Sequence, residues 1–282
     1  MKNGKIALVI EGGGFKSVFS AGVLDAFLVN NFNPFDIYIA VSSGAMALSY
    51  YLSNKYKAYF SLSHDVCVNE HFLSFKNSLS EEGYMNLKYL TQYAVKTNPL
   101  DIVEIGKNTL NKKFYVVATN KDNGAPIYLE PSEKNIYQSL RATSSLPFFT
   151  KGLCKINGLN LMDGAWSDPI PVKSAIDFGA NKIVVIRPHP QGYKFDGLNY
   201  LGLIAGYWWQ NNTKISDQFF QEYDNYNKAV DFLNIKHKDI EISQISPKEL
   251  LKSTVLGTTQ KDLLDDYRCG LDIGMDFLNS YS

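Results

Sequence analysis

The stretch IALVIEGGGFKS, residues 6–17, decides the fold of this chain. Its continuous apolar run, from Ile6 to Ile10, is typical of a strand that is buried on both faces. Three glycines follow, and apolar residues then recur at helical spacing from Val18 to Leu28. The pattern predicts a buried strand, a tight glycine turn and a helix.

A second strand, turn and helix follow directly along the chain. Residues 35–41 are typical of a strand, Ser42-Ser43-Gly44 of a sharp turn, and residues 45–52 of a helix. Together the two segments predict a βαβ unit, whose parallel strands bring both loops to the carboxyl edge of the sheet. We therefore expect the glycine loop to face the serine turn.

The serine turn has the chemistry of a nucleophile elbow. A serine raised on a tight strand-to-helix turn exposes its hydroxyl group, and the turn leaves little room for side chains two residues to either side. For Ser42, Gly44 meets this demand fully, whereas Ala40 carries one more methyl group than the usual glycine. Ser43 is a poorer candidate for the nucleophile, because larger residues flank it.

The glycine loop has the chemistry of an oxyanion hole. Gly12, Gly13 and Gly14 allow the backbone to turn its N–H groups toward one point at a helix N-terminus, where the helix dipole favours negative charge. A dinucleotide site would need a glycine where Ser17 stands, and a P-loop would need one at Phe15. The spacing supports neither of these phosphate-binding sites.

A third motif supplies a candidate base for the serine. Asp163 stands in an Asp-Gly pair at the end of a predicted strand, although such a pair is usually only a turn. Two alternatives remain on the residues alone. His189 lies just beyond another predicted strand, and Asp168 is a second carboxylate whose place before a proline equally suits a loop or a helix cap.

With these motifs, the sequence resembles the patatin-like phospholipase family, and its bacterial branch in particular, over about residues 5–187. The resemblance rests on ALVIEGGGFKSVFSAGVLDAFL, AVSSGA and MDGAWSDPIPV, in that order. It implies an α/β fold with α/β/α layers and a mainly parallel central sheet. It also implies a Ser–Asp dyad that hydrolyses acyl esters of lipids without a histidine, a metal or a cofactor. By position, Ser42 matches the nucleophile, Asp163 the base, and Gly12, Gly13 and Gly14 the oxyanion loop.

Two departures from the family pattern bear on activity. Lys16-Ser17 stands where relatives have Arg-Gly, and Ala40 replaces the first glycine of G-x-S-x-G. Neither departure removes a catalytic side chain, so we expect a serine acyl ester hydrolase. The alternative is an inactive member that binds a lipid or a protein partner through the same cleft. A cation at position 16 opposes the helix dipole, so we expect Lys16 to support the loop by holding a carboxylate or a substrate phosphate.

Composition sets the broad class of protein. The 282 residues include 28 basic and 28 acidic side chains, so no net charge indicates nucleic acid as a partner. Three widely spaced cysteines predict reduced thiols rather than disulfides or a metal site. The first five residues lead directly into the first strand and leave no room for a signal peptide, which predicts a cytoplasmic protein.

Beyond residue 190 the catalytic motifs end. We expect residues 1–190 to form the catalytic core and residues 191–282 an extension packed on the same domain. Within this extension, residues 214–232 predict one amphipathic helix, residues 239–245 a strand, and Thr259 to Asp262 a capping box at the start of the last helix.

Residues 198–209 form an apolar, aromatic stretch that is too short to span a bilayer. Two interpretations are open. The stretch is either a buried core element or a lip of the cleft, at which Trp208 and Trp209 make peripheral contact with a membrane.

Overall fold

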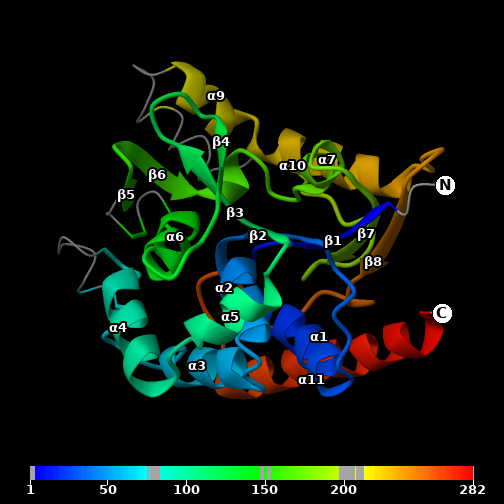
Figure 1. Ribbon diagram of the computed structural model, residues 1–282. Coiled ribbons are helices and arrows are strands. Elements are labelled where there is room, and N and C mark those ends of the chain that lie inside the picture. Colours follow the sequence, from blue (N-terminus) through cyan, green and yellow to red (C-terminus); the bar gives the residue numbers. More distant parts are fainter. Residues whose placement is uncertain are drawn as a thin grey trace.

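A β-sheet runs through the middle of the protein, with helices on both of its faces (Figure 1). The computed structural model describes residues 4–74, 76, 83–146, 149–150, 154–196, 207 and 213–281. The three motifs found in the sequence all fall within these ranges. The stretch 198–209 lies outside the described residues, apart from Tyr207, and both interpretations of it stay predictions.

The sheet is mixed, with a parallel centre. Its strands follow the order β5-β6-β3-β2-β1-β7-β8, and β4 pairs with β3 off this path. The five strands β3-β2-β1-β7-β8 are parallel, while β4, β5 and β6 are antiparallel to their partners. The strand bounds are β1 Lys5–Ile10, β2 Ile37–Val41, β3 Lys113–Asn120, β4 Pro126–Leu129, β5 Cys154–Ile156, β6 Leu159–Asp163, β7 Ala180–Ile186 and β8 Glu241–Ile245.

The helices form a layer on each face of the sheet, and this arrangement confirms the predicted α/β/α fold (Figure 1). The helix bounds are α1 Ser17–Val29, α2 Ser42–Leu52, α3 Ala58–Val66, α4 Leu87–Thr97, α5 Ile102–Asn108, α6 Ile136–Thr143, α7 Val172–Asp177, α9 Thr213–Phe220, α10 Glu222–Asn234 and α11 Gln260–Ser280, with short 3-10 turns η1 Gly14–Lys16 and η3 Gly164–Trp166. Alternate residues of β1 and β2 point into separate cores. One core lies against α1, α2, α3 and α11, and the other against α7 and α10.

The last helix packs closely along the first. On α11, Gly270 faces α1, where an added Cβ would overlap the carbonyl oxygen of Phe19; on α1, a Cβ at Gly22 would overlap the carbonyl oxygen of Tyr267. Because both contact positions are glycines, the backbones of the two helices can approach each other closely. A buried hydrogen bond of 2.7 Å from the Tyr267 hydroxyl to Asp25 Oδ2 fixes the register of this seam.

The structure corrects and confirms details of the C-terminal region. The single helix expected over 214–232 is wrong, because two helices, α9 and α10, meet at Gln221. One half of the predicted capping box is present: the Thr259 side chain accepts a hydrogen bond of 3.1 Å from the Asp262 N–H at the start of α11, and the Asp262 carboxylate bonds to the Thr259 hydroxyl at 2.7 Å. The predicted strand is β8, which pairs in parallel with β7 and so extends the central sheet.

Candidate active site

Ser42 lies at the junction of β2 and α2 in a strained conformation. Its φ angle is +53°, in the left-handed region that serine rarely adopts. Gly44 must be a glycine, because an added Cβ would lie 2.5 Å from the backbone oxygen of Glu11. Ala40 is fully buried within β2, where its methyl group is part of the core. The departure from G-x-S-x-G is therefore accommodated by packing.

The pairing of strands explains why Ser42 and Asp163 meet. Val116 and Val117 of β3 pair with β2 on one side and with β4 on the other. Ala118 and Thr119 pair with β4 and with β6, so β6 must lie on the same side of β3 as β2. The two strands approach each other end to end along this side. Ser42 directly follows the end of one strand, and Asp163 is the last residue of the other.

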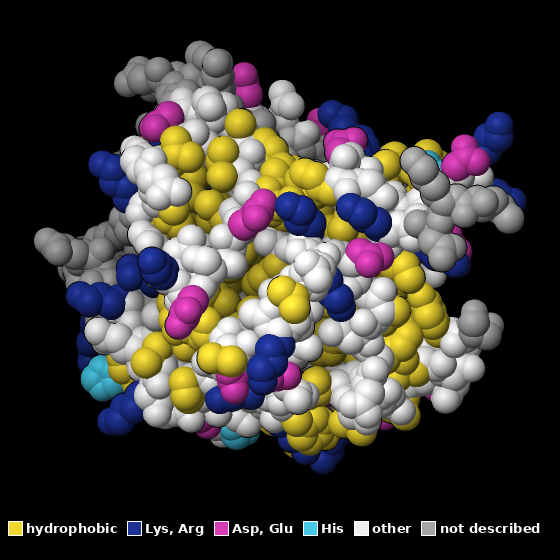
Figure 2. Space-filling model, viewed as in Figure 1, with side chains coloured by type: hydrophobic (Ala, Val, Ile, Leu, Met, Phe, Trp, Pro, Cys, Tyr) yellow, Lys and Arg dark blue, Asp and Glu magenta, His cyan; other side chains and the backbone are white. Residues whose placement is uncertain are grey.

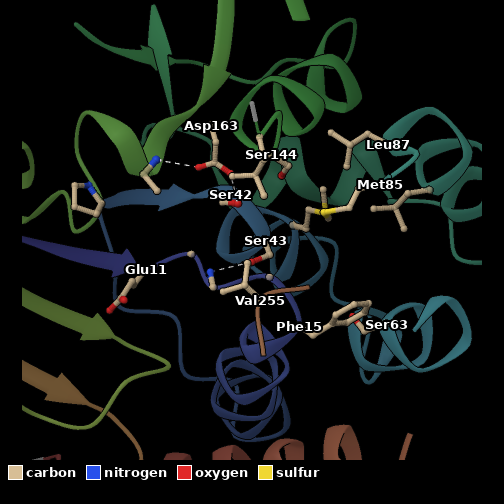
Figure 3. Close-up of a pocket in the computed structure, with 18 of the residues that line it drawn as sticks. Glu11, Phe15, Ser42, Ser43, Ser63, Met85, Leu87, Ser144, Asp163 and Val255 are labelled. Atoms are coloured by element: carbon tan, nitrogen blue, oxygen red, sulfur yellow. Dashed lines mark hydrogen bonds between the residues drawn. The ribbon is translucent and has the colours of Figure 1, made fainter. Parts of the chain in front are cut away.

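Their side chains are in direct contact (Figure 3). The Ser42 hydroxyl donates a hydrogen bond of 2.6 Å to Asp163 Oδ2, while Asp163 Oδ1 accepts one of 2.9 Å from the Ala165 N–H. The backbone N–H of Ser42 is itself held at 2.7 Å by the Thr143 hydroxyl oxygen. This arrangement fixes the position of both the serine and the carboxylate.

Burial raises the pKa of Asp163 to about 6, against the weaker opposing effect of its hydrogen bonds to Ser42 and Ala165. Only 1% of the residue is exposed. A carboxylate with a pKa near 6 is a better base at neutral pH than one with an ordinary pKa. The buried site therefore supplies the basicity that an isolated aspartate lacks.

Each glycine of the loop lies against a different neighbour. A Cβ at Gly12 would stand 2.8 Å from the Ser42 Cβ, so only glycine brings the loop this close to the serine. At Gly14, whose φ is +59°, a Cβ would overlap the carbonyl oxygen of Val255. The Gly13 N–H donates a hydrogen bond of 3.2 Å to the Ser43 hydroxyl.

The three glycine N–H groups of the loop differ in their hydrogen bonds within the described part of the chain. Among the hydrogen bonds of the described residues, the N–H groups of Gly12 and Gly14 have no acceptor. Gly13 is anchored instead, through Ser43, to the buried hydroxyl of Ser17, with 2.7 Å between the two hydroxyl oxygens. The departure from glycine at position 17 thus adds a hydroxyl that helps to hold the loop.

The two alternative bases are engaged elsewhere. Both ring nitrogens of His189 have other partners, Glu11 at 2.8 Å and Lys16 at 3.0 Å. Asp168 Oδ2 accepts hydrogen bonds of 2.8 Å from Tyr128 and from Ser174.

Lys16 lies beside His189 rather than in solvent. Its pKa is lowered by burial, and the negative charges of Glu11 and Asp266 oppose this shift. Its direct contact is with the histidine ring, whose other nitrogen contacts Glu11, and the expected role of Lys16 in holding a carboxylate or a substrate phosphate stays a prediction. Sequence reasoning missed Thr143, Arg187 and Tyr226, whose contacts with Ser42 and Glu11 join segments far apart in the chain.

A cavity of about 200 Å³ opens beside the serine. Figure 3 shows Met85, Leu87 and Phe15 on one side of Ser42 and Glu11 on the other. The first side is almost wholly apolar, with side chains from α2, α3 and α4. Its lining comprises Phe15, Met46, Tyr59, Leu62, Val66, Phe72, Met85, Leu87 and Leu90.

The outer surface carries both signs of charge. On the face seen in Figure 2, hydrophobic side chains are interspersed with Lys, Arg, Asp and Glu, in keeping with the net charge of zero. Across the described residues, no helix combines the length and hydropathy needed to cross a bilayer.

Residues 8–176 match the family model for patatin-like phospholipases, and the chain belongs to this family. The resemblance predicted from the three motifs is thereby confirmed. The chain is 30% identical to the uncharacterized protein YjjU of Escherichia coli (strain K12) over 279 residues, which is 98% of this chain and 77% of that protein. Residues 212–282 match a domain of unknown function (DUF6363).

Among solved structures, the fold is similar to that of VipD from Legionella pneumophila. The TM-score is 0.51 at 14% sequence identity, and the match covers 99% of this chain and 67% of VipD.

Proposed function

We propose that this protein hydrolyses acyl esters of lipids through a dyad of Ser42 and Asp163. One observation carries the proposal: the Ser42 hydroxyl donates a hydrogen bond of 2.6 Å to a buried carboxylate, beside a glycine loop and an apolar cavity. Membership of the patatin-like phospholipase family supports the same reaction class.

In the first half of the reaction, Ser42 Oγ attacks the ester carbonyl carbon and passes its proton to Asp163 Oδ2. The carbonyl oxygen becomes an oxyanion, which accepts hydrogen bonds from the N–H groups of Gly12 and Gly14. The bond from carbon to the leaving oxygen then breaks, and Asp163 returns the proton to the departing alcohol. An acyl group remains on Ser42.

In the second half, water attacks the carbonyl carbon of this acyl-enzyme. The water gives one proton to Asp163, the oxyanion forms again on the glycine loop, and Ser42 Oγ leaves with the proton from Asp163. The carboxylic acid is released and the dyad returns to its starting state. No step requires His189 or a metal ion.

The acyl chain of the substrate would occupy the apolar side of the cavity, between α2, α3 and α4. Aliphatic and aromatic side chains there exclude water and bury the hydrocarbon chain, at about 0.8 kcal/mol for each buried methylene. The leaving alcohol would face the opposite side, near Glu11 and His189. This division favours a lipid ester over a small polar ester.

The test combines turnover with labelling. Purified protein is incubated with p-nitrophenyl esters of increasing chain length and, separately, with a fluorophosphonate probe. We expect hydrolysis that improves with chain length, and probe on Ser42 in the wild type but not in Ser42→Ala. Folded wild-type protein that neither turns over ester nor takes up probe would overturn the proposal and favour a family member that only binds its lipid or protein partner.

A further inference from the structure

The three residues that follow β7, Arg187 to His189, each contact the glycine loop or a residue next to it. Arg187 Nε donates a hydrogen bond of 3.0 Å to Glu11 Oε2, directly before the glycines. Pro188 packs against the middle of the loop, where a Cβ at Gly13 would lie 3.0 Å from the proline Cγ. The third residue, His189, contacts the residues on both sides of the glycines.

The ring of His189 connects Glu11 to Lys16. Its Nδ1 lies 2.8 Å from Glu11 Oε1, and its Nε2 lies 3.0 Å from Lys16 Nζ. A lysine ammonium group can only donate, so Nε2 accepts and Nδ1 carries the proton that it donates to Glu11. The neutral ring therefore bridges the residue before the glycines and the second residue after them.

The charges around Glu11 make this bridge rigid. Burial alone would raise the pKa of the Glu11 carboxyl, but the hydrogen bond from the His189 ring and the positive charge of Arg187 outweigh burial and hold the pKa below its ordinary value. The Arg187 side chain is fully buried as well. Because a buried charge that loses its partner is strongly destabilising, neither group can move away from the other.

The C-terminal region completes the arrangement. Tyr226 of α10 donates a hydrogen bond of 2.9 Å to Glu11 Oε1 and accepts one of 2.9 Å from Arg187 Nη2. The carbonyl group of Val255 lies directly against Gly14. Both residues belong to the part of the chain, 212–282, that matches a domain of unknown function.

We propose that Arg187, His189 and Tyr226 form a clamp that holds the glycine loop in the geometry that binds the oxyanion, with His189 as its central positioning residue. The C-terminal region thereby acts in catalysis, because it supplies Tyr226 to the clamp and backs Gly14 with Val255. The inference rests on the proposed acyl hydrolase function. Loop N–H groups fixed in advance stabilise the transition state without reorganisation, whereas a loose loop must first be ordered.

Two substitutions of the histidine separate its two contacts. His189→Asn places an amide nitrogen near the Nδ1 position and can still donate to Glu11, but it loses Lys16. His189→Gln places an amide oxygen near the Nε2 position and can still accept from Lys16, but it loses the donor to Glu11. We expect either change to lower kcat by about 10-fold and His189→Ala by about 10- to 100-fold, with KM changed less than about twofold.

A double-mutant cycle tests whether Lys16 acts through the histidine. Lys16→Met keeps most of the side-chain volume and removes the ammonium group. We expect it to lower kcat by about 10-fold in the wild type but by less than about twofold in His189→Asn, where the contact is already lost. His237→Ala is the matched control, because His237 contacts the backbone oxygen of Phe232, away from the loop, and should leave kcat unchanged.

Amide hydrogen exchange of the peptide that covers residues 11–16 gives a readout that does not depend on turnover. We expect faster exchange in His189→Ala and in Tyr226→Phe than in the wild type or in His237→Ala. An inactive wild-type protein whose loop still loosens in these variants would overturn the acyl hydrolase function but leave the clamp in place. Unchanged exchange and unchanged kcat in folded His189→Ala would overturn the clamp, and so would additive losses in the double-mutant cycle.

Discussion

Glu11 and Asp163 are both buried carboxyl groups at the ends of strands, one at each side of the site, yet their pKa values move in opposite directions. The pKa of Asp163 is raised to about 6 by burial, and its hydrogen-bond partners are a hydroxyl and a backbone N–H, which carry no charge. Glu11 has the same burial, but a hydrogen bond from His189 and the positive charge of Arg187 lower its pKa. The partner, rather than burial, decides which carboxylate can take a proton and which stays a fixed anion.

The two carboxyl groups, Asp163 and Glu11, should differ most in their effect on catalysis. Asp163→Asn should lower kcat by about 10³- to 10⁴-fold, because the amide cannot accept the proton of Ser42. Steady-state hydrolysis of a p-nitrophenyl ester measures the effect. Asp168→Asn is the matched control, since Asp168 is a half-buried carboxyl group that follows Asp163 closely in the chain but bonds to Tyr128 and Ser174. Loss of activity in His189→Ala alone, with Asp163→Asn still active, would show that the base is wrongly assigned.

The second difference is in the stability that each carboxylate confers. Glu11→Gln should lower the free energy of unfolding at pH 7 by about 3 to 5 kcal/mol, because it leaves the buried Arg187 without its counter-charge. Since the pKa of Glu11 is lowered on folding, its stabilising effect is present above its ordinary value of 4.5 and is lost as the pH falls further. Urea unfolding at several pH values measures the loss.

An exposed ion pair gives the control for this measurement. Glu241→Gln breaks a contact with Lys182 in which both side chains are more than half exposed, and it should cost less than about 1 kcal/mol. If both variants lost the same free energy of unfolding, the charge of Glu11 would contribute no more to stability than a charge on the surface does.

Asp163 should show the reverse behaviour, with a somewhat smaller effect. Its pKa is higher in the folded protein than the ordinary value of 3.8, so ionisation opposes folding as the pH rises from 3.8 to about 6. Asp163→Asn should therefore raise the free energy of unfolding at pH 8 by up to about 3 kcal/mol. The gain should disappear near pH 4. A variant less stable than the wild type at pH 8 would contradict this sign.

Local parts of this site could be predicted from the sequence. A buried strand, a tight turn and a helix are encoded by neighbouring residues, so both the glycine loop and the turn at Ser42 follow from short patterns. The Asp-Gly motif offered Asp163 as a base beside His189 and Asp168, and the family resemblance selected it. The direct contact between the two side chains depends on β2 and β6 sharing one side of β3, and no local pattern specifies that pairing.

The partners that keep Glu11 ionised could not be predicted from the sequence, because they too are distant in the chain. Arg187 and Tyr226 follow Glu11 in the chain by 176 and 215 residues, and only the folded sheet brings them together. Lys16 was recognised because its charge opposes the helix dipole, which predicted an anionic partner but could not identify it. The prediction of a single helix over 214–232 was wrong because the apolar periodicity of the sequence continues through Gln221, whereas the helix is interrupted at that residue between α9 and α10.

The activation of Ser42 by Asp163 can be followed through the rate at which a fluorophosphonate modifies Ser42 between pH 4.5 and 8. We expect this rate to rise with pH through a single ionisation near pH 6, as Asp163 loses its proton, and then to level off. In Asp163→Asn, the residual rate should be far slower and should not show this ionisation. The same titration in both proteins, or a rate in Asp163→Asn that equals that of the wild type, would contradict this role of Asp163.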